Sequence, residues 1–236
     1  MKTLVVYCHP SRESFVAAVL DATLEGLRDG EHEVRVTDLY ADGFDPVFSA
    51  EDHANHLADD VDRTGIARYI EDLRWCESLV LVYPTWWAGQ PAMLKGWIDR
   101  VWVNGVAWKL PAGKRRLKPL LRSIHRITVV TTHGSSKIIN ALEGEGGKRT
   151  VTRSLRALCS RTCRTHWIAM YTVDTSTELQ RAQFLHRVRL RLAADLRRRS
   201  GRGAGNDDRV GGADNTALDL LRDREEHHLA ADREVG

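Results

Sequence analysis

The first segment of the sequence that could do chemistry is HPSRESF, from His9 to Phe15. It combines a histidine, two serine hydroxyls and an arginine, and it directly precedes an amphipathic stretch that predicts a helix. The N-terminus of a helix presents free N–H groups and the positive end of its dipole, so this segment could bind an anion. The alternative is an ordinary helix cap, with Ser14 as the capping residue and Phe15 in the core.

The second such segment is YPTWWAGQP, from Tyr83 to Pro91, which places two adjacent tryptophans on a loop. A fold gains little stability from two large rings at such a position. A flat aromatic ligand, in contrast, would gain a stacking face and an apolar wall. The alternative is that the rings of Trp86 and Trp87 cover the hydrophobic core beneath a long loop.

The third segment is TTHGSSK, from Thr131 to Lys137, which offers backbone N–H groups, hydroxyls, a histidine and a lysine. Such a loop can hold the electron-rich edge of a ring and stabilise negative charge that develops there. Considered alone, His133 is more typical of a capping or solvent-facing histidine than of a catalytic one. The chain has no GxxxxGK[ST] motif and no GxGxxG after the first predicted strand, so P-loop and Rossmann dinucleotide sites are not supported.

Each of the three segments follows an apolar, partly β-branched run that predicts a buried strand, at residues 4–8, 78–83 and 126–132. Further strands are predicted at 33–40 and 165–171, and helices at 15–27, 66–74, 91–101, 148–160 and 178–198. Residues 41–65 and 105–123 show little periodicity. This alternation is typical of an α/β fold with an open parallel sheet covered by helices on both faces. Ligands bind such sheets at the carboxyl ends of the strands, where the three segments would meet.

The character of the sequence changes near residue 199. Residues 199–236 contain no aromatic residue and no isoleucine, and charged residues and glycine dominate. A segment of this composition buries too little apolar surface to offset the entropy of ordering. We therefore expect one domain over residues 1–198 and a charged, disordered tail over residues 199–236. A C-terminal arm that packs through its leucines is the alternative.

Composition excludes several classes of protein. The chain has 35 Lys and Arg against 32 Asp and Glu, a net charge of only +3, so no nucleic-acid partner is expected. No stretch approaches the ~20 consecutive apolar residues of a membrane span, and no signal peptide is recognisable, so we expect a cytoplasmic protein without membrane insertion. The four cysteines do not form a disulfide framework. We expect Cys159 and Cys163 to pack in the core from a helix, with a redox-sensitive pair as the alternative, and we expect no metal site.

Together these segments resemble the NAD(P)H:quinone oxidoreductases, a branch of the flavodoxin-like superfamily. The best match is YPTWWAGQPAMLKGWIDRVW at 83–102, which is similar to the family's flavin-ring loop and the helix after it. CHPSRESF at 8–15 is similar to the flavin-phosphate loop, and TTHGSS at 131–136 to the third flavin loop. The resemblance covers residues 1 to about 195 and implies a flavodoxin-like fold, an open parallel sheet with helices on both faces.

By this resemblance the chain is a flavoprotein enzyme, an NAD(P)H dehydrogenase (quinone) that reduces quinones or related electrophiles by two electrons in a ping-pong cycle. The resemblance implies FAD as the cofactor, with FMN as the alternative, NAD(P)H as the electron donor, and a homodimer as the assembly. The implied cofactor-binding residues are His9, Ser11, Ser14 and Phe15 for the phosphate and ribityl chain, Pro84, Thr85, Trp86 and Trp87 for the isoalloxazine ring, and Thr132, His133 and Gly134 for its pyrimidine edge.

The sequence departs from this family near the third segment. Ile139 and Glu145 stand where mammalian members carry a tyrosine and a histidine proposed to relay a proton, and His133 replaces a glycine. His133 is therefore the candidate catalytic residue, stabilising charge at the pyrimidine edge. Two other functions are open: a regulatory flavoprotein partner of a potassium-efflux transporter, which would share the flavin loops, and a flavodoxin-type one-electron carrier. Carriers of the second kind are usually acidic, unlike this chain.

Overall fold

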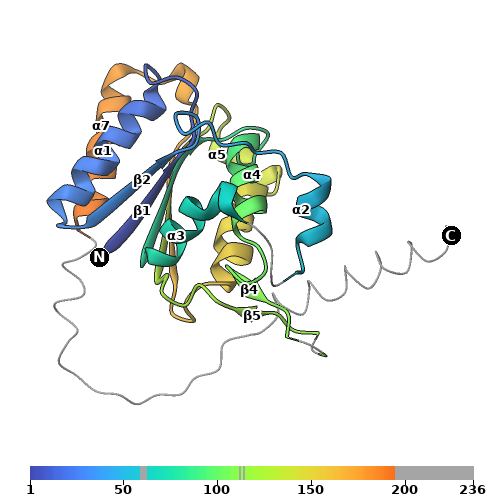
Figure 1. Cartoon of the computed structure of the whole chain (residues 1–236). Coiled ribbons are helices and arrows are strands. Elements are labelled where there is room, and N and C mark those ends of the chain that lie inside the picture. Colours follow the sequence, from blue (N-terminus) through green and yellow to red (C-terminus); the bar gives the residue numbers. More distant parts are fainter. Residues whose placement is uncertain (59–62, 112, 114, 195–236) are drawn as a thin grey trace, which may run out of the picture. The chain divides into compact units, whose positions relative to one another are not determined.

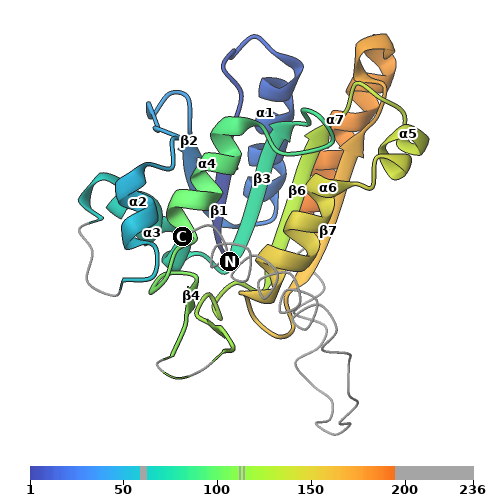
Figure 2. The same ribbon diagram turned by 90° about the vertical axis from the view of Figure 1, so that its right-hand side faces the viewer.

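The computed structural model of this chain describes residues 1–58, 63–111, 113 and 115–194. A central sheet of five parallel strands, seen edge-on in Figure 1, has the order β2-β1-β3-β6-β7, which can be followed in Figure 2. The strands are β1 Lys2–Tyr7, β2 Glu33–Asp38, β3 Ser78–Pro84, β6 Arg126–Thr132 and β7 Arg164–Met170. This order defines the flavodoxin-like fold, in which the winding of the chain reverses between β1 and β3.

The central strands form where the sequence has unbroken apolar runs. Successive residues of a strand face opposite sides of the sheet. In β1, Leu4 and Val6 therefore enter one hydrophobic cluster, whereas Val5 and Tyr7 enter the other. Because each central strand contributes to both clusters, its sequence is apolar throughout rather than alternating.

Helices cover both faces of the sheet, as expected (Figures 1 and 2). One face carries α1 (Phe15–Asp29) and α7 (Glu178–Ala193); the other carries α3 (Ala67–Trp75), α4 (Ala92–Val101) and α6 (Gly146–Arg149), which continues as a π-helix over Thr150–Leu155. α1 and α7 approach closely at Gly26, where an added Cβ would lie 2.5 Å from the Arg189 carbonyl oxygen. The expected α/β fold, with two helical layers around a parallel sheet, is confirmed.

The prediction of a single helix over residues 148–160 is wrong. The structure has α6 and then the π-helix, in which the Thr152 hydroxyl donates to the Lys148 carbonyl oxygen at 2.8 Å. Beyond residue 157 the backbone pairs with residues 121–124 instead of continuing the helix. Cys159 and Cys163 consequently lie outside a helix, although both thiols are buried in the core as expected.

Several short elements were not predicted from the sequence, α2, α5, β4 and β5 among them. α2 (Ala50–Asn55) begins at a capping box formed by Ser49 and Asp52, inside the segment expected to be irregular. Ser136 caps α5 (Lys137–Leu142). β4 (Trp108–Lys109) pairs antiparallel with β5 (Lys118–Pro119) outside the main sheet. Each of these elements is at most six residues long, which is too short for hydrophobic periodicity to reveal.

The end of β2 differs from the prediction, and the predicted end of the last helix falls outside the described residues. β2 ends at Asp38 rather than at residue 40, because Asp38 Oδ1 accepts the N–H groups of Tyr40 and Ala41, both at 3.2 Å. Residues 195–198 at the expected end of the last helix, the domain boundary at residue 198 and the tail over 199–236 lie outside the described residues. In the described part of the chain, no helix is long and apolar enough to cross a membrane.

Candidate functional site

The three segments identified in the sequence meet at one edge of the sheet, beyond the C-terminal ends of β1, β3 and β6. β1 pairs directly with β3. The register between β3 and β6 places Pro84 beside Thr132. The Thr85 N–H then donates to the Thr132 carbonyl oxygen at 2.8 Å, which ties the second and third segments together. This edge is the point at which open α/β sheets bind ligands.

The segment His9–Phe15 is a closely hydrogen-bonded helix cap. Ser14 Oγ accepts the Ala17 N–H at 3.2 Å and donates to the Ser11 carbonyl oxygen at 2.9 Å. The Ser11 N–H donates to His9 Nδ1 at 3.0 Å, so these two residues shape the turn itself. The capping role of Ser14 is confirmed. Ser14 takes the Ala17 N–H, so the first-turn donors that remain for an anion are the N–H groups of Phe15 and Val16 ahead of it.

Neighbouring elements hold two further side chains of this segment. Phe15 packs against the Phe184 ring of α7 at a centroid distance of 6.2 Å, and the Arg181 guanidinium lies over the Phe15 ring. Arg12 forms an ion pair with Asp38 at the end of β2, while 60% of the Arg12 side chain stays exposed. Phe15 therefore packs on the hydrophobic layer, as the cap interpretation states, and Arg12 adds positive charge beside the helix N-terminus.

The two tryptophans lie on a tight turn that holds them in solvent. The N–H and carbonyl groups of Trp86 and Gly89 bond to each other at 3.1 and 2.9 Å. The two residues between them, Trp87 and Ala88, have φ values of 48° and 56°, which are left-handed conformations that favour glycine. Trp86 is 62% exposed and Trp87 is fully exposed. The interpretation in which both rings cover the core is therefore wrong.

His133 lies beneath the site edge rather than in solvent. The residue is 6% exposed, and its ring stacks on Tyr171 with centroids 4.7 Å apart. The backbone N–H of His133 donates to the Met170 carbonyl oxygen at 2.8 Å. This N–H is therefore used within the fold and is not one of the donors that the third segment can offer to a ligand. What His133 presents to the edge is Nε2, which lies 3.5 Å from Thr85 Oγ1.

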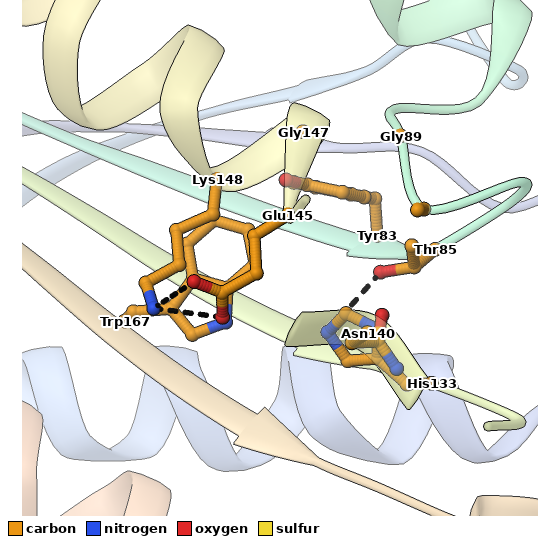
Figure 3. Close-up of a pocket in the computed structure, with 10 residues that line it drawn as sticks. Tyr83, Thr85, Gly89, His133, Asn140, Glu145, Gly147, Lys148 and Trp167 are labelled. Atoms are coloured by element: carbon orange, nitrogen blue, oxygen red, sulfur yellow. Dashed lines mark hydrogen bonds and ion pairs between the residues drawn. The ribbon is translucent and has the colours of Figure 1, made fainter. Parts of the chain in front are cut away.

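Figure 3 shows the pocket that His133 faces, between the tryptophan turn and the start of α6. The Lys148 ammonium donates to both carboxylate oxygens of Glu145 at 2.8 Å. The Gly147 N–H donates to the Ala88 carbonyl oxygen at 2.9 Å, so the start of α6 is bonded to the tryptophan turn. The other lining residues include Tyr83, Gly89, Asn140 and Trp167.

Burial governs the protonation of this pocket. It lowers the pKa of His133 below its ordinary value, and the nearby Asn140 and Glu145 side chains oppose the shift only in part. Burial also raises the pKa values of Tyr83 and Tyr171. At neutral pH the imidazole is therefore neutral, with one nitrogen carrying a proton and the other free to accept one. Within the described ranges, no group of three His, Cys, Asp or Glu side chains could hold a metal ion.

The structure gathers the predicted residues around one edge but adds others that sequence reasoning missed. Tyr83 and Trp167 lie within strands, where their apolar surroundings gave no signal beyond core packing. Lys148 was placed only in a helix, and Asn140 was assigned no role. Glu145 was noticed solely as a departure from a family pattern. Their common position at the pocket follows from the folding of α5 and α6 over the sheet edge, which no local motif encodes.

A sequence profile described as flavodoxin-like fold matches residues 1–196, and the chain belongs to this family. The strand order described above agrees with this assignment.

Curated relatives carry oxidoreductase names. The chain is 37% identical over 117 residues to an uncharacterized NAD(P)H oxidoreductase, YcaK, of Escherichia coli (strain K12), a match covering 48% of this chain and 60% of that protein. It is 29% identical over 166 residues to NAD(P)H dehydrogenase [quinone] 1 of Cavia porcellus, which covers 62% of this chain and 58% of that protein. The matches thus span little more than half the length of these relatives.

Solved structures share the fold over most of the described chain. Smu.1420 from Streptococcus mutans UA159 superposes with a TM-score of 0.70 at 28% identity, covering 82% of this chain and 99% of that one. An NAD(P)H:quinone oxidoreductase from Methanothermobacter marburgensis gives a TM-score of 0.71 at 23% identity, covering 81% and 96%. At that identity the second similarity shows the fold alone.

Proposed function

We propose that this chain is an enzyme that binds a flavin at the C-terminal edge of the sheet. With it the enzyme transfers two electrons from NAD(P)H to a quinone or a related electrophile. The observation that carries the proposal is the pair of exposed tryptophans on the turn after β3, at the same edge of the sheet as the N-terminus of α1 after β1. Such a turn offers a stacking face and the helix offers an anion site, which are the two surfaces that a flavin nucleotide requires.

The phosphate end of the flavin fits the first segment. The N-terminus of α1 supplies backbone donors and the favourable end of the helix dipole. The hydroxyls of Ser11 and Ser14 and the ring of His9 shape that turn, and Arg12 beside it adds a positive charge. Phe15 would contribute through its backbone at the first turn of the helix, because its ring is packed on α7.

The ring of the flavin fits the second and third segments. Pro84, Thr85, Trp86 and Trp87 would line the isoalloxazine and exclude water from its face. Thr132 and Gly134 would lie at the pyrimidine edge. His133 would contribute indirectly, through the contact between its Nε2 and Thr85 Oγ1. A bound flavin supplies the chemistry of accepting hydride from a nicotinamide and passing two electrons to the acceptor. The protein supplies donors that stabilise the charge formed on the ring.

FAD is the proposed form of the cofactor, with FMN as the alternative. The resemblance to quinone oxidoreductases favours FAD, and the exposed Arg12 side chain offers a charge for a second phosphate. Mass spectrometry of the cofactor released by heating decides between them.

The proposed assembly is a homodimer. Ile138 and Leu142 on α5 are 74% and 84% exposed, and Trp87 at the same edge is fully exposed. Large exposed apolar side chains that lie near one another are typical of contact surfaces. Light scattering in solution tests this proposal through the molar mass of the particle.

The first test of the function is the absorbance spectrum of the purified protein from 300 to 550 nm, recorded without oxygen before and after addition of NADPH. A flavin spectrum that bleaches on addition and returns when a quinone is added supports the proposal. A colourless protein that also fails to take up FMN or FAD contradicts it.

A further inference from the structure

The segment between the π-helix and β7 carries two cysteines that the proposed function does not use. Cys159 and Cys163 flank a turn that is closed by the Cys163 N–H, which donates to the Ser160 carbonyl oxygen at 2.9 Å. Both cysteines are 1% exposed and belong to one hydrophobic cluster. The turn directly precedes β7, so the pair lies at the opposite ends of the strands from the candidate flavin site.

The two thiols contact each other. The Cys159 thiol forms a hydrogen bond with the Cys163 sulfur, so the two side chains point toward one another across the turn. A disulfide requires its two cysteines to be close in space with converging side chains. The reversal of the chain between residues 159 and 163 meets this requirement in the folded protein.

Neighbouring elements fix the backbone of both cysteines. The Arg122 guanidinium donates to the Cys159 carbonyl oxygen at 2.9 Å. The Arg156 Nε–H donates to the Cys163 carbonyl oxygen at 2.8 Å. Both hydrogen bonds use backbone oxygen atoms, so neither depends on the state of the sulfur atoms. A bond between the sulfurs can therefore form without displacing the turn.

Cys163 differs from the other buried thiols in its protonation. Burial raises the pKa values of Cys8 and Cys76 to about 12, which keeps both thiols protonated and unreactive. The pKa of Cys163 is lowered instead, first by the hydrogen bond from Cys159 and then by the positive charges of nearby arginines, including Arg156. Core packing explains why Cys163 is buried, but it does not explain this stabilised thiolate, which is the reactive form of cysteine.

We infer that Cys159 and Cys163 form a redox modification site, at which a peroxide converts the pair into a disulfide and a thiol reductant restores it. This site goes beyond the proposed function and requires no flavin. Cys163 reacts with the peroxide, and Cys159 resolves the product. Thr162 and Arg164 on either side of Cys163 are exposed, so only the opening of a surface turn separates this thiol from a molecule as small as hydrogen peroxide.

The reaction balances in two steps. The Cys163 thiolate attacks one oxygen of hydrogen peroxide, the O–O bond breaks, and a sulfenic acid and hydroxide form. The Cys159 sulfur then attacks the Cys163 sulfur, the S–S bond forms and the S–O bond breaks. The Cys159 proton leaves with the departing oxygen as water. In total two thiols are oxidised, and hydrogen peroxide is reduced to two water molecules.

The test uses the full chain with its cysteines reduced, treated with hydrogen peroxide while folded. Catalase removes the peroxide, and the chain is unfolded in excess N-ethylmaleimide before digestion with trypsin. Trypsin cleaves after Arg161, so a disulfide between Cys159 and Cys163 joins two peptides that separate on reduction with dithiothreitol. We expect mass spectrometry to show this linked pair. We also expect Cys163 to react on the order of tenfold faster than Cys76, because the thiolate population changes tenfold for each unit of pKa.

Three variants separate the roles of the cysteines. Cys163→Ala should leave Cys159 as a free thiol. Cys159→Ala should stop the reaction at the sulfenic acid on Cys163, which dimedone labels. Cys76→Ala is the matched control, because Cys76 is equally buried, and it should form the linked pair normally. Denaturant unfolding verifies that each variant is folded before treatment.

Three outcomes would overturn the inference. They are a folded chain in which Cys163 stays a thiol after peroxide treatment, a disulfide that joins Cys76 instead, and equal rates of reaction at Cys76 and Cys163. The comparison of rates is made within the unaltered chain, so it holds even if a variant fails to fold.

Discussion

At the level of single residues, the tryptophan turn is the most unusual feature of the site. A left-handed backbone costs a residue other than glycine roughly 1–2 kcal/mol, and both Trp87 and Ala88 adopt it. Glycine in both positions would remove that cost, yet the sequence has a tryptophan and an alanine there. Strain of this kind clusters at ligand sites, where the surrounding structure maintains it.

Ala88→Gly should therefore stabilise the protein by about 1 kcal/mol, because glycine adopts a positive φ without steric cost. Thermal or denaturant unfolding measures this change. Ala18→Gly, within α1, is the matched control and should destabilise by a similar amount. A loss of stability in Ala88→Gly would show that the turn is not strained.

Trp87→Ala should lower the affinity for flavin by about two- to tenfold, since aromatic stacking contributes about 0.5–1.5 kcal/mol. The melting temperature should not change, because the side chain is fully exposed in the described structure. Titration of the protein with flavin gives the affinity. Leu179→Ala, at a 68% exposed position on α7, is the control and should bind flavin normally. Equal affinity in both variants would remove Trp87 from the site.

At the level of elements, the site depends on α6 being bonded to the tryptophan turn. An added Cβ at Gly147 would lie 3.0 Å from the Ala88 carbonyl oxygen and from Gly89 Cα. Both of these neighbours are backbone atoms and cannot move aside alone. The start of α6, which carries Glu145 and Lys148, therefore has its position fixed relative to the turn.

Gly147→Ala should separate α6 from the turn, at a cost of about 1–3 kcal/mol in stability, and weaken flavin binding. Gly146→Ala is the matched control, since nothing lies within 4 Å of a Cβ added there. Unfolding and flavin titration of the two variants test the prediction. Gly147→Ala with unaltered stability and affinity would contradict it.

The same elements show how far sequence reasoning reaches. The parallel sheet and its covering helices were predictable because apolar runs and helical periodicity are local signals. The convergence of three loops followed from parallel strand direction alone. The burial of His133 was not predictable, because it results from Tyr171 and α5 folding over the loop. The π-helix was not predictable either, since the pairing of residues 158–160 with 121–124 joins distant parts of the chain.

At the level of the whole molecule, a second histidine with a lowered pKa, the half-buried His32, lies at the opposite edge of the sheet from His133. At the edge opposite the site, His32 Nδ1 lies 2.8 Å from Thr3 Oγ1. Burial, followed by the positive charges of the N-terminus and Arg126, lowers the pKa of His32 to about 4. The unfolded chain binds a proton at the ordinary value of about 6.5, so acid favours unfolding.

The stability that His32 contributes is complete above pH ~6.5 and is lost as the pH falls toward 4. Allowing for solvent screening of this partly exposed ring, the loss between pH 7 and pH 5 should be about 1 kcal/mol. His32→Gln should therefore show a smaller difference in denaturant midpoint between these two pH values. Replacing the exposed His186 by Gln provides the control. Equal pH sensitivity in the His32 variant and the unaltered protein would refute the prediction.

The uneven exposure of the tryptophans gives the protein a built-in optical reporter. Of its seven indoles, Trp97 and Trp102 are almost completely buried, whereas Trp87 is fully exposed. Dissolved iodide should quench the long-wavelength part of the fluorescence emission, which comes from the rings in water. Any planar molecule that settles on the tryptophan turn should shield that emission from iodide, so occupancy of this edge can be followed without a label.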